Sequence, residues 1–449
     1  MTNLAKIDKD LHLKIKIESL KNLGDEYWSF QKSYERDYAH NYFKYPAMMV
    51  PQMVRKILNE FTHIDSNVKY IHDPFLGSGT VLTEAMLQGL EFVGRDINPL
   101  SILLSKVKYG PFNIKILNKK ILILIKKIEI DNSNHIDICF NNIDKWFRKD
   151  VQIDLCKIRR AIKEESTLWV RRFFWIVLAE TIRQTSNSRT STYKLHIRTK
   201  EDIKMRIINV ISVFRKVLHL NFINYSKTCI HLNEKNLLNN KGIYTKKVNL
   251  FLGDARTNLK ITNKYDLIFT SPPYGDNQTT VPYGQYSYLP LSWIELSDID
   301  KKITYECLKT LSDIDNRSLG GIKCKDIKKE EYLKKISPTY TKYYIEFQNK
   351  PKDLLNKITS FFYDLDQSIN MILKNLRKDG YLIWVLGNRT VGGINISLDE
   401  ILKELLHQRE VQFIDIIFRP IHNKRMASKN KSSSTMTRES IAIFRKINH

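Results

Sequence analysis

The segment from Tyr70 to Pro99, YIHDPFLGSGTVLTEAMLQGLEFVGRDINP, constrains the fold more than any other part of the chain. It predicts a strand that ends at Asp73, a tight turn, a helix that begins near Thr80 and a second strand that ends at Asp96. Gly77 and Gly79 permit positive φ and a close backbone approach within the turn. The free N–H groups at the start of the helix can bind a negative or polar ligand.

Two missing sequence features narrow the range of ligands that this turn could bind. The third glycine of a dinucleotide-binding turn would fall at Leu82, and no lysine follows Gly79 as in a phosphate-binding loop. Asp96 closes the second strand, where a carboxylate can accept hydrogen bonds from ribose hydroxyls. The pattern therefore suits an amino acid joined to a nucleoside, as in S-adenosylmethionine. An ordinary structural turn between strand and helix is the alternative.

The rest of the chain alternates strand and helix signals around two large insertions, which predicts a mostly parallel sheet. Helical spacing dominates the first insertion, and residues 285–355 show no clear alternation. Strand signals return at VNLFLGDAR and YDLIFTSPPYG. PKDLLNKITSFFYDLDQSINMILKNLRKDG predicts one long amphipathic helix that stops at Gly380, and a strand, a helix near 398–408 and two further strands follow it.

Composition favours a globular protein with an anionic partner. Apolar residues make up 42% of the 449 residues, and Lys plus Arg exceed Asp plus Glu by 73 to 48, a net charge of +25. Nucleic acid is the first candidate partner, although the richness in Lys, Ile and Asn also fits a bias of AT-rich coding sequence. There is no run of eighteen apolar residues, no secretory signal pattern and no Cys-x-x-Cys pair, so we expect a cytoplasmic protein without membrane or metal partners.

Two motifs together resemble the amino-methylating DNA methyltransferases, which act on cytosine N4 or adenine N6 with S-adenosylmethionine. They are DPFLGSGT with GRDINP at 73–99, and TSPPYG at 270–275. YFKYPAMMVP at 42–51 and LGDAR at 252–256 are similar to further motifs of the family, and the last strands match as well. The resemblance covers about residues 40–110, 247–290 and 355–446. It implies an α/β fold with a Rossmann-like, seven-stranded, mostly parallel sheet, a terminal antiparallel hairpin and a mainly helical insertion.

The resemblance also assigns the chemistry of the proline turn. The exocyclic amine is a poor nucleophile, and acceptors aimed at its hydrogens favour the geometry of attack on the sulfonium methyl group. Ser271 and the carbonyl of Pro272 would be these acceptors, because prolines hold the backbone still and offer no competing N–H. Tyr274 would stack on a base flipped out of the duplex, a contact worth about 1–3 kcal/mol. Serine at the first position favours cytosine N4, whereas adenine enzymes more often carry Asp or Asn there.

The expected site residues follow from these motifs. The catalytic set is Ser271, Pro272, Pro273 and Tyr274. The expected S-adenosylmethionine contacts are Tyr45, Pro46, Asp73, Phe75, Gly77, Ser78, Gly79, Thr80, Asp96, Ile97, Asp254 and Ala255. The expected DNA contacts are Arg183, Arg189, Tyr283, Lys424 and Arg425, with a solvated loop or a packed loop as the alternative.

The predicted division of the chain has three parts. Residues 1–110 form an N-terminal segment and the cofactor-binding half, 111–246 a helical insertion for target recognition, and 247–449 the catalytic half with a second insertion at about 285–355. The expected partners are double-stranded DNA and a cognate restriction endonuclease. Three rival functions stay open: adenine-N6 methylation, guanine-N2 methylation of RNA, and a non-catalytic DNA-binding specificity protein.

Overall fold

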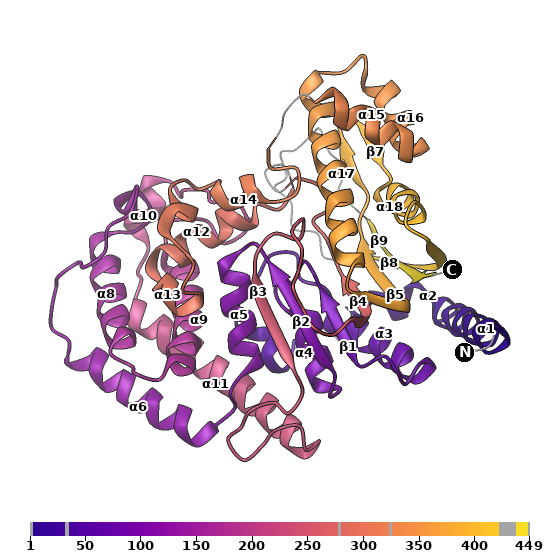
Figure 1. Ribbon diagram of the computed structural model, residues 1–449. Helices are drawn as coiled ribbons and strands as arrows, with labels where there is room; N and C mark the ends of the chain where they lie inside the picture. The colour runs from indigo at the N-terminus through magenta and orange to yellow at the C-terminus, as the bar shows by residue number, and fades with distance from the viewer. Residues whose placement is uncertain (1–2, 32–35, 277–279, 323–325, 422–436, 448–449) are drawn as a thin grey trace.

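The computed structural model describes residues 3–31, 36–276, 280–322, 326–421 and 437–447. One sheet of seven strands forms its centre (Figure 1). In spatial order the strands are β3 (Val248–Leu252), β2 (Glu91–Asp96), β1 (Tyr70–Asp73), β4 (Tyr265–Thr270), β5 (Leu376–Leu386), β9 (Arg438–Lys446) and β8 (Val411–Pro420). The strands from β3 to β5 pair in parallel, and β9 runs antiparallel to both β5 and β8. The expected α/β fold with a terminal antiparallel hairpin is confirmed.

Both faces of the sheet are buried, so its strands alternate between two cores rather than between core and solvent. On β4, Leu267 and Phe269 belong to one core, whereas Tyr265 and Ile268 belong to the other. The first core includes α3 (Pro51–Ile64), α4 (Thr80–Leu87) and α5 (Pro99–Tyr109). The second core is formed with α16 (Pro338–Phe347), α17 (Lys352–Leu373) and α18 (Leu398–His407).

The first insertion is a helical bundle whose central helix, α9 (Leu168–Thr185), is mostly buried. Its helices are α6 (Ile114–Ile130), α7 (Ile143–Trp146), α8 (Lys149–Lys163), α9, α10 (Lys200–Met205) and α11 (Val210–Glu234). Helix α9 buries Phe173, Trp175 and Ile176 and packs against α5, α8 and α11. Because α5 leads directly from β2, this contact joins the bundle to the β2 side of the sheet, and the bundle lies beside the sheet in Figure 1.

The segment after β4 is divided between the two sides of the sheet. α12 (Tyr283–Trp293) and α13 (Leu296–Ile299) pack against α9, and the Asp298 carboxylate accepts hydrogen bonds from Arg171 and Trp175. η3 (Tyr305–Leu308) and α14 (Asp313–Arg317) follow, after which α15 (Ile327–Ile336) and α16 pack against α17. Figure 1 shows α15 to α18 grouped away from the helical bundle. The region without clear alternation is thus a series of short helices.

The remaining elements that the structure describes are two N-terminal helices, a short 3-10 helix and a small hairpin. α1 (Asn3–Lys21) packs against α3 and β8, where the ammonium group of Lys21 lies 2.6 Å from the carboxylate of Asp415. α2 (Gly24–Ser29) also contacts β8, and η2 (Tyr38–Asn41) contacts α11. β6 (Arg389–Val391) and β7 (Ile394–Ile396) form a small separate hairpin. Within the described residues, none of the helices is long and apolar enough to cross a membrane.

One predicted boundary was wrong. The helix expected to continue to Gly380 ends at Leu373, and β5 begins at Leu376 and runs through Gly380. Leu376 is fully buried and pairs with Tyr265 before a register shift. Residues 376–380 therefore form part of β5, although their local apolar spacing alone would fit a helix.

Candidate active site

The two motif turns begin side by side, because β1 and β4 are parallel neighbours whose carboxyl ends lie at one edge of the sheet. The hydroxyl group of Thr270 donates a hydrogen bond of 2.7 Å to Oδ1 of Asp73. The same oxygen accepts the N–H of Phe75 at 3.1 Å. The buried carboxyl group of Asp73 therefore joins the end of β4 to the glycine turn.

The glycine turn is held by the end of the next strand, β2. Gly77 and Gly79 have φ of 49° and 69°, the left-handed region that glycine adopts without strain. The N–H of Gly77 donates to Oδ2 of Asp96 at 2.7 Å, and the N–H of Asn98 donates to Oδ1 at 2.8 Å. The Asp96 carboxylate thereby holds both the glycine turn and the start of α5, and it lies in the wall of the cavity beside them.

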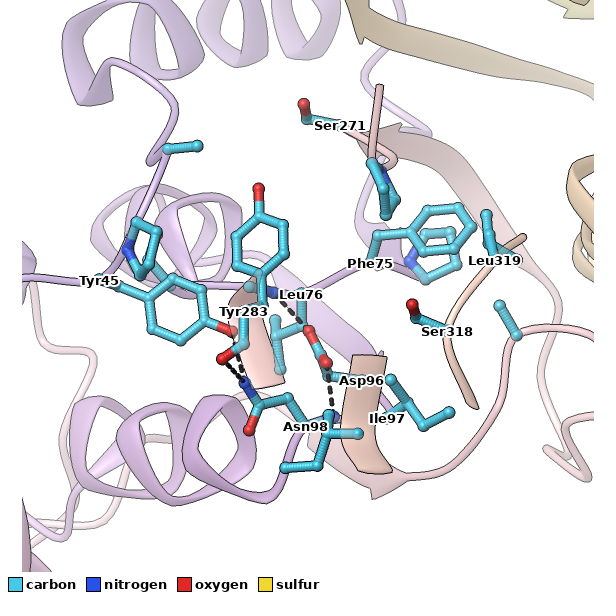
Figure 2. A pocket seen from close by; sticks show the side chains of 18 of the residues that line it. Tyr45, Phe75, Leu76, Asp96, Ile97, Asn98, Ser271, Tyr283, Ser318 and Leu319 are labelled. Carbon is cyan, nitrogen blue, oxygen red and sulfur yellow. Dashed lines mark hydrogen bonds between the residues drawn. The ribbon is translucent and has the colours of Figure 1, made fainter. Parts of the chain in front are cut away.

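A cavity of about 100 Å³ lies against these turns (Figure 2). The ring of Tyr45 stacks on that of Tyr283 with centroids 5.8 Å apart, and Asn98 donates a hydrogen bond to the Tyr45 hydroxyl at 3.0 Å. Phe75 and Leu319 lie on the opposite side of the cavity, below Ser271. The cavity thus combines aromatic and apolar walls with the polar groups of Asp96 and Asp254.

Most of the expected cofactor residues line this cavity. These are Tyr45, Pro46, Phe75, Gly77, Ser78, Asp96, Ile97, Asp254 and Ala255. Asp73, Gly79 and Thr80 are not among the lining residues. Asp73 holds the turns, a Cβ on Gly79 would lie 2.8 Å from Oγ of Ser105, and Thr80 starts α4.

Sequence reasoning missed part of the wall. Ile314, Arg317, Ser318 and Leu319 line the cavity from α14 and the residues after it. They come from the second insertion, whose residues carry no motif pointing to a ligand. Asn98 was also missed, although it lies inside the motif GRDINP and its neighbour Asp96 was identified.

A second cavity of about 290 Å³ adjoins the first. Ser271, Pro272 and Tyr274 of the proline turn line it, together with polar residues from the N-terminal segment and the last two strands. The residues that line both cavities are Ala47, Met48, Ser271 and Tyr283. Ser271 therefore stands where a ligand in one cavity would meet a ligand in the other.

Comparison with known proteins agrees with this geometry. The model of a family described as DNA methylase, the N6/N4 methyltransferases, matches residues 5–106. The Type II methyltransferase M.MvaI of Kocuria varians is 32% identical over 456 aligned residues, which cover 98% of this chain and 96% of that protein. The chain belongs to the N6/N4 DNA methyltransferase family. The Type II methyltransferase M.MjaII of Methanocaldococcus jannaschii is 31% identical over a shorter stretch of 113 residues, 25% of this chain and 21% of that protein.

Enzymes of this family take their methyl group from S-adenosylmethionine, and the chemistry of the first cavity fits that molecule. The Asp96 carboxylate in the cavity wall suits ribose hydroxyls, and Phe75 and Ile97 offer apolar surface to a purine. When bound, the cofactor supplies an electrophilic methyl group on a sulfonium centre. The residues that line the first cavity would hold and orient it.

The expected DNA-contacting residues lie in different surroundings. Arg183 is paired with Glu180 at 2.5 Å, and Arg183 and Arg189 line a small hollow of about 30 Å³ beside Tyr193. Tyr283 lines both main cavities. Lys424 and Arg425 lie outside the described residues. Among the described residues, Tyr193 lines both the hollow of Arg183 and Arg189 and the second cavity, which Tyr283 also lines.

A half-buried arginine, Arg389, lies against the proline turn. Gly275 has φ of 156°, and a Cβ there would lie 1.6 Å from Nη1 of Arg389. The same guanidinium group lies 3.5 Å from the carboxylate of Asp276, which is fully buried. Arg389 therefore fills the space that any side chain at position 275 would need.

We expect Gly275→Ala to lower both the thermal stability and the methylation rate, because Arg389 must leave its place beside Asp276. Backbone strain alone costs on the order of 1–3 kcal/mol. Gly24→Ala is the matched control, since Gly24 has φ of 77° and nothing within 4 Å of its Cβ position. Equal melting temperatures for the two variants would contradict the clash with Arg389.

A pH dependence follows from Asp73. Burial raises the pKa of its carboxyl group to about 7, so ionisation at higher pH costs folding free energy. Asp73 therefore destabilises the fold progressively as pH rises from about 4 to about 7, and Asn at this position cannot ionise. We expect Asp73→Asn to gain stability relative to wild type as pH rises: the free energy of unfolding of the variant minus that of wild type should be larger at pH 8 than at pH 5 in urea titrations. The same difference at both pH values would show that Asp73 does not titrate in this range.

Proposed function

We propose that the chain is a Type II methyltransferase that transfers a methyl group from S-adenosylmethionine to the exocyclic N4 amine of a cytosine in double-stranded DNA. The observation that carries the proposal is the junction of two cavities at Ser271, with the proline turn in the wall of both. The methyl donor occupies the cavity beside Asp96, and the flipped base occupies the cavity beside Tyr274. The near-complete alignment with M.MvaI supports the Type II assignment.

The catalytic roles follow from this arrangement. Ser271 Oγ and the Pro272 carbonyl accept hydrogen bonds from the amine, which directs its lone pair at the methyl carbon. The ring of Tyr274 stacks on the base, and this contact offsets part of the few kcal/mol lost when the base leaves the duplex. Holding both partners in place contributes at most about 7–11 kcal/mol of the barrier reduction.

Recognition of the duplex is assigned to the helical insertion and to the basic surface. The net charge of +25 favours phosphate contacts and a salt-sensitive affinity. Arg183 and Arg189 on the insertion, and Lys424 and Arg425 before β9, are the proposed contacts. A paired restriction endonuclease that cuts the unmethylated site, in the same cytoplasm, completes the proposed system.

Adenine N6 is the second candidate target, because the junction at Ser271 would serve any exocyclic amine. Serine at position 271 favours cytosine. Incubation with duplex DNA and labelled cofactor, followed by digestion to nucleosides and mass spectrometry, separates the candidates. We expect N4-methylcytosine from duplex DNA, no product from tRNA, and a rate lowered at least about 100-fold in Ser271→Ala because one preorganised acceptor is lost. N6-methyladenine as the product would move the assignment to adenine, and methylated tRNA would overturn the DNA assignment.

A separate prediction tests the cofactor site. Asp96→Ala removes the two oxygens that face the proposed ribose and that hold the N–H groups of Gly77 and Asn98. We expect the affinity for S-adenosylhomocysteine, measured by calorimetry, to fall at least about tenfold, since hydrogen bonds to charged groups contribute roughly 1.5–3 kcal/mol each. Glu91→Ala, at the other end of β2, is the control and should bind normally. Unchanged affinity in Asp96→Ala would remove the ribose role.

A further inference from the structure

The second cavity holds an ion pair whose role the proline turn alone does not explain. Arg419 on β8 lies opposite Glu439 on β9 in the strand register, and their side chains form an ion pair. Both residues line the cavity beside Ser271 and Tyr274, although their side chains are only 8% and 18% exposed. Arg419 also donates a hydrogen bond of 3.2 Å to the carbonyl of Trp28, so it is held from the N-terminal side as well.

The Glu439 carboxylate continues into a chain of hydrogen bonds that ends at the proline turn. The hydroxyl of Tyr274 donates to Oε1 of Glu439 at 3.3 Å. The hydroxyl of Ser271 donates to the Tyr274 oxygen at 3.2 Å. Glu439, Tyr274 and Ser271 are therefore connected in one line, with Arg419 holding the far oxygen of the carboxylate.

The carboxylate fixes the direction of this line. An ionised carboxylate only accepts hydrogen bonds, so the Tyr274 hydroxyl must donate its single proton to the hydrogen bond with Glu439. Burial and then the neighbouring Glu439 charge hold the pKa of Tyr274 well above its usual value, so the phenol keeps that proton. The Tyr274 oxygen is then free only to accept, and Ser271 must donate to it. Ser271 is left with lone pairs, and no proton, to face a substrate amine.

We propose that Glu439 is a positioning residue that sets Ser271 as a hydrogen-bond acceptor and takes up the proton released by the amine; this rests on the proposed function. As the N–CH₃ bond forms and the S–CH₃ bond breaks, the amino nitrogen becomes positively charged and must lose one proton. That proton passes to Ser271 Oγ while the serine proton passes to Tyr274 and the phenol proton to Glu439. Glu439 ends as a neutral carboxylic acid and returns its proton to solvent, so charge and atoms balance.

A double-mutant cycle under single-turnover conditions tests this relay. Glu439→Gln removes the proton acceptor and brings an amide N–H that can reverse the line, and Tyr274→Phe keeps the stacking ring but breaks the line. We expect each to lower the methylation rate at saturating DNA and cofactor by roughly 10- to 100-fold, the size of a lost hydrogen bond to a charged group. Because both act on one line, the double variant should be within about threefold of the slower single variant. Multiplying effects, or a wild-type rate in Glu439→Gln, would overturn the proposal.

Further measurements separate the relay from a purely structural ion pair. Glu439→Asp should recover part of the rate, and the KM for DNA and the calorimetric affinity for S-adenosylhomocysteine should stay within about twofold of wild type in all variants. Asp415→Asn is the control, because it removes an ion pair from the same strand as Arg419 and Asp415 does not line the cavity. A loss confined to KM, or an equal loss in Asp415→Asn, would assign Glu439 a structural role. If the wild-type enzyme methylates no DNA, the proposed function fails; if it does and the variants match it, only the relay fails.

Discussion

The hydrogen bond from Thr270 to Asp73 is the contact on which the site depends. Its two residues are the last of β4 and β1, so it joins the neighbouring strand ends directly below the two turns. The residue after Asp73 begins the glycine turn, and the residue after Thr270 is Ser271. Two turns whose anchoring residues are 197 positions apart therefore start from one buried point, which is why the cavities they line meet at Ser271. Burial at that point destabilises the ionised form of the Asp73 carboxyl group and so raises its pKa.

The second insertion forms part of the wall of the first cavity. Asp315 on α14 accepts hydrogen bonds from the N–H groups of Gly284 and Gln285, at the first turn of α12. That turn carries Tyr283, whose ring stacks on Tyr45 and lines both cavities. Helix α12 in turn rests on α9 of the first insertion. Both insertions thus hold Tyr283 in place, so movement of the helical bundle on binding a large partner would reach the site through α12.

The parts of the fold and site that the sequence predicts are those with local causes. Gly77 and Gly79 must adopt positive φ, and an apolar run must end before Pro272, so both turns can be found from neighbouring residues. Gly380 misled the helix prediction because pairing of Leu376 with Tyr265 is a tertiary effect. Ser318 and Leu319 reach the cavity only because Asp315 fixes α14 against α12, and Glu439 meets Tyr274 only through strand register. Such contacts between residues far apart in the sequence cannot be predicted from a local sequence pattern.

A DNA methyltransferase must both attract a DNA duplex and bind a methyl donor and a target amine, and different charges of the chain suit these two tasks. The chain as a whole carries +25, whereas each cavity is lined by charges of both signs: Asp96, Asp254 and Arg317 in the first, and Glu439, Arg36 and Arg419 in the second. Phosphates act over about a Debye length, roughly 8–10 Å, and are attracted by the basic surface as a whole. A sulfonium ion and an exocyclic amine act at contact distance and need acceptors. A net positive charge can therefore attract the duplex over this range, whereas Asp96 and the ion-paired Glu439 offer acceptors only at contact distance, so added salt weakens the first interaction far more than the second.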